Sequence, residues 1–310
     1  MWMQSQFINV FREISHEEEK VEEMIPEYFQ PHYQDLIHMN VTKENYKYLI
    51  ELCDFLHVTN VDIIIDKIVD VFDDINIIYT FEKFYKTYSQ RLIPMDNETL
   101  KNAITLWIIN DKECYRQYGF SSFWDVSKIK KMDYLFKNSN FNGDISRWDV
   151  SNVIDMFEMF FNSKFNGDIS RWDVSNVVHM SGMFNLSLFT GDISNWNVSK
   201  VKYMSGMFKG SLFNSDISRW DVSNAIFMSV MFKESLFNGD ISRWDISRVR
   251  FMWGMFLYSQ FEGDVSKWNP KNLWEGRHMF SNPKFANDIK KWDVLCKDMI
   301  VKSPQTLTNS

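Results

Sequence analysis

Aspartate is the residue of this chain whose type and spacing could carry acid–base chemistry, because it returns at a fixed interval of 24 residues. The copies are Asp144, Asp168, Asp192, Asp216, Asp240, Asp264 and Asp288. A catalytic carboxylate needs one particular geometry around it, whereas seven copies at one spacing belong to a scaffold. Aspartate at a turn accepts backbone N–H groups, which is the role we expect here. We therefore expect no enzyme activity and no cofactor.

Metal and redox chemistry are not indicated either. The six histidines are His16, His32, His38, His57, His179 and His278. No two of them stand four residues apart, and none neighbours a cysteine at the spacing of zinc ligands. Cys53, Cys114 and Cys296 are isolated and form no CxxC pair, which favours buried thiols in a reducing compartment. The chain carries no phosphate-binding glycine loop and no GxSxG motif.

Two charged columns recur with the same interval. The basic column is Arg147, Arg171, Asn195, Arg219, Arg243, Lys267 and Lys291. The acidic column, two residues further on, is Asp149, Asp173, Asn197, Asp221, Asp245, Asn269 and Asp293. Rows of opposite charge neutralise each other as cross-strand pairs, and both lose charge together at Asn195 and Asn197, which supports that pairing. The alternative is a charged binding face in which Arg147, Arg171, Arg219 and Arg243 take part.

A third column varies far more between the copies and is the best candidate for an interface. It lies seven residues after each recurrent tryptophan and reads Lys131, Asp155, His179, Tyr203, Phe227, Phe251 and Glu275. Its middle is aromatic and its ends are polar, and Trp253 lies two positions beyond Phe251. An exposed aromatic stripe marks an interface, while the same residues packed under a neighbouring loop would be structural; both interpretations stay open.

Tryptophan sets the interval that positions all of these residues. Eight tryptophans stand 24 residues apart without a slip: Trp124, Trp148, Trp172, Trp196, Trp220, Trp244, Trp268 and Trp292. Two phenylalanine columns, beginning at Phe136 and at Phe141, keep the same step. A fixed period of this length predicts a solenoid in which each coil buries its apolar side against the next, with the aromatic rings stacked as structural columns.

Within one repeat, the spacing of apolar residues predicts the local structure. Trp148-Asp149-Val150 alternates in, out, in and predicts the short strand of a parallel sheet. Residues 153–160 have the three- and four-residue spacing of one or two helical turns. Asn-Gly then turns the chain back. The glycine column, Gly143, Gly167, Gly191, Gly239 and Gly263 with Ser215 as its exception, is expected at positive φ.

The phrase FNGDISRWDVSNV, with the following MxxMF, resembles the BspA-like leucine-rich repeat, a family first described as a mycoplasma lipoprotein repeat. The resemblance covers residues 120–295 and implies protein binding without catalysis. Members of that family occur in bacterial surface proteins, in protists and in large DNA viruses. This chain shows neither the secretion signal nor the lipoprotein cysteine of the surface members, which favours an intracellular, cytoplasmic location; a viral member would lie in the host cytoplasm or the virion.

Residues 1–112 have a different pattern and predict a helical domain that caps the first coil. Helices are expected at 15–29, 48–56, 75–88 and 99–109, the last begun by Asp96, and residues 61–72 are expected to form either an apolar helix or a buried strand. The stretch from Tyr48 to Phe72 is similar to the helical half of BTB and Skp1-like domains, which would imply an adaptor linked to a cullin.

The charge also separates the two parts of the chain. Residues 1–60 hold 11 acidic and 4 basic residues, so they carry the entire net charge of −7, and the repeats are neutral overall. No basic stripe suited to nucleic acid and no membrane-spanning run is evident.

Together these features predict an α+β protein: a helical domain at 1–112, an eight-coil leucine-rich-repeat-like solenoid with a parallel β-sheet at 113–300, and a polar tail at 301–310. The predicted function is that of a protein-binding scaffold. The alternatives are a substrate adaptor of a cullin-type ubiquitin ligase and a structural component of a viral particle.

Overall fold

The computed structural model describes residues 92–280 and 285 of the 310. The helices predicted before residue 92, the BTB-like stretch, Trp292 and the tail at 301–310 lie outside these residues. The chain divides into two compact units, Met1–Leu92 with Lys112–Phe120 and Ile93–Asp111 with Ser121–Ser310. In the first unit, helix α8 (Asp111–Tyr118) supplies most of the described residues, and Cys114 and Tyr115 are buried.

The second unit begins with strand β1 (Ile93–Pro94) and helix α7 (Asn97–Ile109). The Asp96 side chain accepts a hydrogen bond from the Thr99 amide at 2.8 Å, which satisfies one of the first amides of α7. The helix that the sequence predicted here is therefore confirmed. Its apolar face buries Leu100, Ala103, Ile104 and Trp107, and the Trp107 ring packs 4.6 Å from that of Phe141, measured between centroids. Helix α7 thus covers the side chains at the start of the repeats.

Strand β1 pairs in parallel with strand β2 (Trp124–Asp125), with Ile93 opposite Trp124. A single 3₁₀ turn, η1 (Ser121–Phe123), precedes β2 and is fully buried. Pairing β2 with β1 supplies backbone partners for the first repeat, which has no repeat before it. The predicted boundary at residue 112 differs from this division, because β1 and α7 belong to the same compact unit as the repeats.

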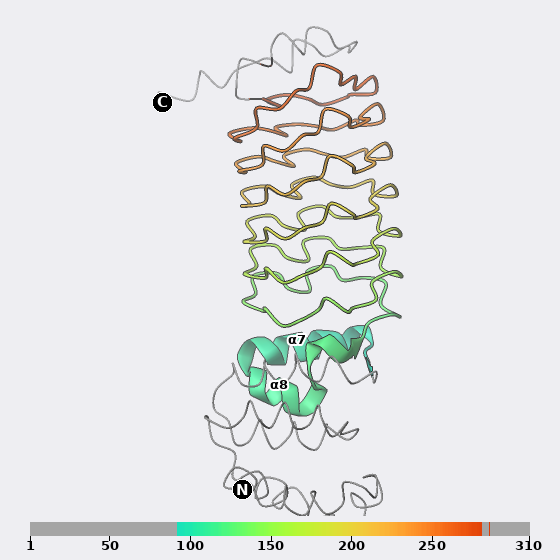
Figure 1. Cartoon of the computed structure of the whole chain (residues 1–310), viewed down its shortest axis with the longest axis vertical. Coiled ribbons are helices and arrows are strands. Elements are labelled where there is room, and N and C mark those ends of the chain that lie inside the picture. Colours follow the sequence, from blue (N-terminus) through green and yellow to red (C-terminus); the bar gives the residue numbers. More distant parts are fainter. Residues whose placement is uncertain (1–91, 281–284, 286–310) are drawn as a thin grey trace, which may run out of the picture. The chain divides into compact units, whose positions relative to one another are not determined.

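The repeats lie one on another as successive coils (Figure 1). Parallel bridges join equivalent residues of neighbouring repeats, from Lys131 with Asp155 to Phe251 with Glu275. Between them, alternate amides donate to the next repeat: Met156 to the His179 carbonyl at 2.8 Å and Phe160 to the Met183 carbonyl at 2.9 Å. The same bonds recur 24 residues later, so each coil is held to the next by backbone hydrogen bonds on this side.

These bridges do not lie where the sequence predicted the strand. No strand forms at Trp148-Asp149-Val150, because the Trp148 amide bonds within its own repeat to the Ile145 carbonyl at 3.1 Å. The Val153 amide closes a second turn onto the Val150 carbonyl at 2.9 Å. Amides that close turns inside one repeat are not available to the next one. The predicted helical turns at 153–160 are also wrong, since that segment carries the bridges.

Positive φ angles explain why residues 153–160 do not continue as a helix. Ten residues after each tryptophan, φ lies between 49° and 65°, at Tyr134, Glu158, Gly182, Gly206, Val230, Gly254 and His278. The turn Met156–Met159, closed by a 3.2 Å bond from the Met159 amide to the Met156 carbonyl, has Glu158 at this position. One left-handed residue in each turn reverses the backbone and prevents a second helical turn from forming.

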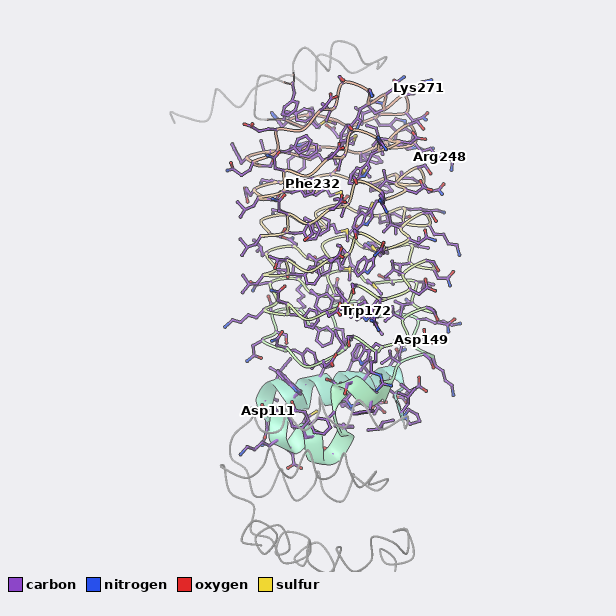
Figure 2. All side chains as sticks on the ribbon, viewed as in Figure 1. Asp111, Asp149, Trp172, Phe232, Arg248 and Lys271 are labelled. Carbon is purple, nitrogen blue, oxygen red and sulfur yellow. The ribbon has the colours of Figure 1, made fainter. Side chains whose placement is uncertain are left out.

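Three aromatic columns make the core of the stack. In the column that begins at Phe136, successive ring centroids lie 5.2–5.8 Å apart with planes within 9° of parallel. Trp148, Trp172 and Trp196 stack at 6.4 Å. The second phenylalanine column contacts the first, as in the pair Phe208–Phe213 at 4.2 Å. Figure 2 shows Trp172 and Phe232 within the coils, with Asp149 and Arg248 at their edge.

The glycine column serves a purpose other than the predicted one. Gly143, Gly167, Gly191, Gly239 and Gly263 do not have positive φ. A Cβ atom on Gly191 would lie 2.8 Å from the ring of Phe189, and the other four meet the same ring edge at 2.6–2.9 Å. Glycine is needed because the phenylalanine two residues earlier folds its ring over the backbone, so the constraint is space rather than φ.

Candidate binding surface

The aromatic column that varies between repeats forms a continuous ladder of rings, here called the aromatic stripe (His179, Tyr203, Phe227 and Phe251). Ring centroids are 5.1 Å apart from His179 to Tyr203, 5.1 Å from Tyr203 to Phe227 and 4.8 Å from Phe227 to Phe251. The last two pairs are nearly parallel, at 13° and 2°. The stripe is therefore one connected surface feature.

The backbone ladder positions these rings. Each stripe residue is a bridge residue, paired in parallel with its neighbours in the repeats on both sides. The next residue along the chain, such as Met204 after Tyr203, points into the core and is fully buried. Because adjacent side chains of an extended segment point to opposite faces, the stripe residue points outward. Tyr203 is 39% exposed, and the other three are half-buried.

The stripe thus combines the two interpretations that the sequence left open. Its rings bury their faces against one another and leave their edges to solvent, so they stabilise the stack and form an accessible surface at once. Further rings continue it at both ends. Phe157 stacks on His179 at 4.9 Å, and Trp274 meets Phe251 edge-on at 5.8 Å. Beyond His179, the end of the stripe is polar: the His179 Nδ1 atom lies 3.4 Å from a carboxylate oxygen of Asp155.

Trp253 and Trp274 are the exposed tryptophans of this side of the repeats, at 38% and 61%. The sequence identified Trp253 from its place beside Phe251 but missed Trp274. Trp274 falls six residues after Trp268, in a column that reads Lys130, Ile154, Val178, Lys202, Ile226, Arg250 and Trp274. The signal was available, because this column varies in type as much as the stripe does. The Arg250 guanidinium lies over the Trp274 ring at 4.5 Å.

A second apolar row lies two residues after the turns that end each ladder segment. Leu188, Leu212 and Leu236 occupy equivalent positions in three consecutive repeats and are 46–48% exposed. Sequence reasoning did not single them out. The chain places Lys164 before this row and Gln260 after it in the same column.

The charged columns are arranged differently from the prediction. Arg171, Arg219 and Arg243 are exposed, but the ion pairs found within residues 92–280 do not join them to the column of Asp149. Their charge instead acts on the aspartate three residues earlier in the same repeat, as Arg171 does on Asp168. Cross-strand pairing fails because this stretch turns within its own repeat and forms no strand. Arg147 lies over the Phe123 ring at 5.8 Å.

Both aspartate columns hold turns, as the sequence predicted for the first of them. The Asp168 carboxylate accepts the Ser170 amide at 2.9 Å, and Asp173 accepts the Ser175 amide at 3.0 Å. These hydrogen bonds hold the pKa of each carboxyl below its ordinary value, because they stabilise the charged form. Asn197 makes the same turn bond to Ser199 at 3.1 Å, so the bond does not require charge. Each carboxylate is thereby occupied in scaffolding.

Within the described part of the chain, no cluster of three or more His, Cys, Asp or Glu residues is placed to hold a metal ion. Over the same residues, neither helix has the length and apolar character needed to cross a bilayer.

A protein of near-identical stacked units with one variable aromatic surface belongs to the class of repeat proteins. A model of the family described as "Mycoplasma protein of unknown function, DUF285" matches residues 112–212, 185–258 and 212–301. The matches span the repeats and more than half of the chain, so the chain belongs to this family. No curated protein and no solved structure matches it significantly.

Proposed function

We propose that this chain is a non-catalytic protein-binding scaffold and that the aromatic stripe is its binding surface. The observation that carries the proposal is the ladder of rings with exposed edges, in which residue type changes from repeat to repeat while the backbone does not. Aromatic side chains offer large contact area at small entropic cost, which is why they dominate the energetics of protein interfaces.

The repetition of every other polar group supports a role without catalysis. The aspartates, the serines that follow them and the tryptophan indoles make the same bonds in each repeat, so they define a scaffold. The stripe and the column of Lys202 and Arg250 are where the repeats differ most at the surface. A binding protein of this kind gains specificity by varying a few surface positions on a fixed backbone.

We further propose that the repeats form a leucine-rich-repeat-like solenoid of the BspA-like type. Support comes from the phrase FNGDISRWDVSNV and from parallel bridges between successive repeats. In this version the bridges fall at the stripe instead of at the tryptophan. The cullin-adaptor alternative depends on residues 48–72, which the structure does not describe, and no observation of the described residues favours it or the viral alternative.

The test is quantitative affinity purification with the full-length chain from its native source. We expect Tyr203→Ser to lose specific proteins that the wild type retains, because it removes the most exposed ring of the stripe. Leu212→Ser is the matched control, since it removes an apolar side chain of comparable exposure from the same repeat that is not one of the stacked rings. Phe251→Leu keeps an apolar side chain and should give an intermediate loss. Retention of the same proteins by wild type and Tyr203→Ser would overturn the proposal.

A further inference from the structure

The side of the repeats that carries the stripe has an uneven charge. Its four central segments are residues 175–188, 199–212, 223–236 and 247–260, here called the stripe face. They contain six cations, namely Lys200, Lys202, Lys209, Lys233, Arg248 and Arg250. Glu234 is the single acid in these four segments, and its carboxylate lies 3.3 Å from the Lys233 ammonium. With six cations and one acid, the four segments carry a formal charge of +5, although the chain as a whole has a net charge of −7.

Two of these cations lie beside the rings themselves. Lys202 and Arg250 are exposed, and each directly precedes a stripe residue. The ladder fixes their backbones. The Lys202 amide donates a hydrogen bond to the Val178 carbonyl at 3.0 Å, and the Arg250 amide donates one to the Ile226 carbonyl at 2.9 Å. Lys209 and Lys233 follow six residues after Tyr203 and Phe227 in the same segments. Lys202 and Arg250 are therefore the cations that the ladder holds next to the rings.

The acids of the repeats lie in other columns. Asp168, Asp192, Asp216 and Asp240 occupy one exposed column, and Asp173, Asp221 and Asp245 occupy a second one just before the segments of the stripe face. At the ends of the stripe the charge is again mixed, with Asp155 beyond His179 and Glu275 beyond Phe251. A negatively charged partner is therefore attracted to the centre of the stripe face and repelled from the aspartate columns.

From this arrangement, and resting on the proposed function, we propose that the aromatic stripe binds an acidic segment of a partner protein in which carboxylates alternate with apolar side chains. Apolar side chains of such a segment contact the ring edges, and its carboxylates pair with Lys202 and Arg250. The outward edge of an aromatic ring carries partial positive charge, which adds to the attraction for carboxylate oxygens. The three ring-to-ring steps of 5.1, 5.1 and 4.8 Å together equal the length of about five residues of extended chain at ~3.3 Å per residue.

Rings combined with cations also suit single-stranded nucleic acid, but the ring geometry favours protein. Nucleic-acid bases bind by stacking on open ring faces. Here the faces of Phe227 are covered by Tyr203 and Phe251, at 13° and 2° from parallel. Only the edges are open, and edges receive carbonyl and carboxylate oxygens or aliphatic groups rather than bases. The surface therefore fits an acidic, apolar peptide better than an oligonucleotide.

The experiment measures binding of labelled probes to the full-length chain by fluorescence anisotropy. The probes are short peptides that alternate glutamate with leucine or phenylalanine, the matched peptides with lysine in place of glutamate, and a single-stranded RNA oligonucleotide. We expect the acidic peptides to bind best and to weaken as salt is raised. The double variant Lys202→Gln with Arg250→Gln should weaken their binding about tenfold, through loss of two charges at the rim of the site.

Arg219→Gln with Arg243→Gln is the matched control, because it removes the same charge from exposed positions outside the stripe face. It should leave binding unchanged. Equal binding of basic and acidic peptides, tighter binding of the oligonucleotide, or equal effects of the two double variants would overturn the inference. If Tyr203→Ser loses native partners that the wild type retains while acidic peptides fail to bind, the charge inference fails and the proposed function stands. If Tyr203→Ser retains every partner of the wild type, both fail.

Discussion

The tryptophan column and the aromatic stripe are both ladders of rings with a step of 24 residues, but they differ in depth, spacing and composition. Trp148, Trp172 and Trp196 stack at 6.4 Å in the core. The rings of the stripe lie 4.8–5.1 Å apart at the surface and change from histidine to tyrosine to phenylalanine.

The indole N–H accounts for the uniformity of the tryptophans. From Trp148 to Trp268, Nε1 donates to a backbone carbonyl 27 residues earlier, as Trp196 does to Ile169 at 3.1 Å and Trp220 to Ile193 at 3.0 Å. Each of these buried carbonyls receives its hydrogen bond from a tryptophan indole, so no other residue type replaces the tryptophan. In the stripe the backbone itself makes the bonds between repeats, and the side chain is free to vary. Where a side chain makes the hydrogen bond between repeats, the residue type is constant. Where the backbone makes that bond, the residue type can differ from repeat to repeat and serve binding.

The variant with the largest expected effect on stability is Trp196→Ala. It removes a large buried ring and leaves the Ile169 carbonyl unpaired, and we expect the free energy of unfolding to fall by about 3–5 kcal/mol. Urea denaturation measures the loss. Trp253→Ala, at a 38% exposed position, should cost less than ~1 kcal/mol. Similar losses from the two variants would remove the distinction between core and surface tryptophans.

Gly191→Ala tests whether close packing over the backbone limits the core. The new Cβ would lie 2.8 Å from the Phe189 ring, so the ring must shift within a packed column, at about 1–3 kcal/mol. Gly206→Ala is the comparison, because Gly206 has φ of 65° while its Cβ would have 3.8 Å of room. We expect it to cost about 1 kcal/mol through backbone strain. No loss in the Gly191 variant would show that the Phe189 ring is not fixed.

Phe227→Ser probes the stripe itself. It removes a half-buried ring that stacks on Tyr203 and Phe251, and we expect unfolding to become easier by about 1–2 kcal/mol. Thermal unfolding monitored by circular dichroism provides the measurement, with Leu212→Ser as the control. A loss as large as that of Trp196→Ala would place the stripe in the core and weaken its candidacy as a binding surface.

The aspartate turns predict a pH dependence of stability. The backbone amide and the hydroxyl of the serine two residues on donate hydrogen bonds to each carboxylate, and these bonds lower the pKa of Asp168, Asp192, Asp216 and Asp240 from the ordinary 3.8. Stability from these groups is complete above the pKa of the unfolded chain, and it falls as pH drops through the lower pKa of the folded chain.

Replacing all four aspartates with asparagine should flatten the fall in urea midpoint below pH 4, because Asn197 shows that the turn bond survives without charge. The midpoint at neutral pH should change little. An unaltered slope below pH 4 would mean that other carboxylates cause the acid sensitivity.

The smallest expected effect is a gain. Val230 is β-branched and has φ of 53°, while the equivalent residues of the two adjacent repeats, Gly206 and Gly254, are glycines. Val230→Gly should relieve backbone strain, and after allowing for lost contacts we expect a rise in stability of up to about 1 kcal/mol. Calorimetry of the variant provides the check. A clear loss would indicate that packing of the valine methyl groups outweighs its φ.

The sequence predicted the features that depend on side-chain burial. The interval of the tryptophans, helix α7 with its Asp96 cap and the turn role of Asp168 follow from burial and capping rules. It could not predict where the repeats pair, because alternation at Trp148-Asp149-Val150 shows which side chains are buried and not where the amides bond. Positive φ at Glu158, Val230 and Tyr258 was also hidden, since these residue types disfavour it. The candidate stripe was visible as a variable column, and Lys202 and Arg250 stand beside it in the sequence, but the stacking of its rings required coordinates.

The indole bonds that link each repeat to the preceding one have a consequence for the length of the molecule. From Trp148 to Trp268, each such bond spans 27 residues, one repeat and three more, and so joins a repeat to the preceding one. Excising or duplicating one whole unit of 24 residues would let every remaining indole meet an equivalent carbonyl. Unequal recombination between the near-identical gene segments could therefore lengthen or shorten the protein without disrupting its core. Each event would add or remove one residue of the aromatic stripe.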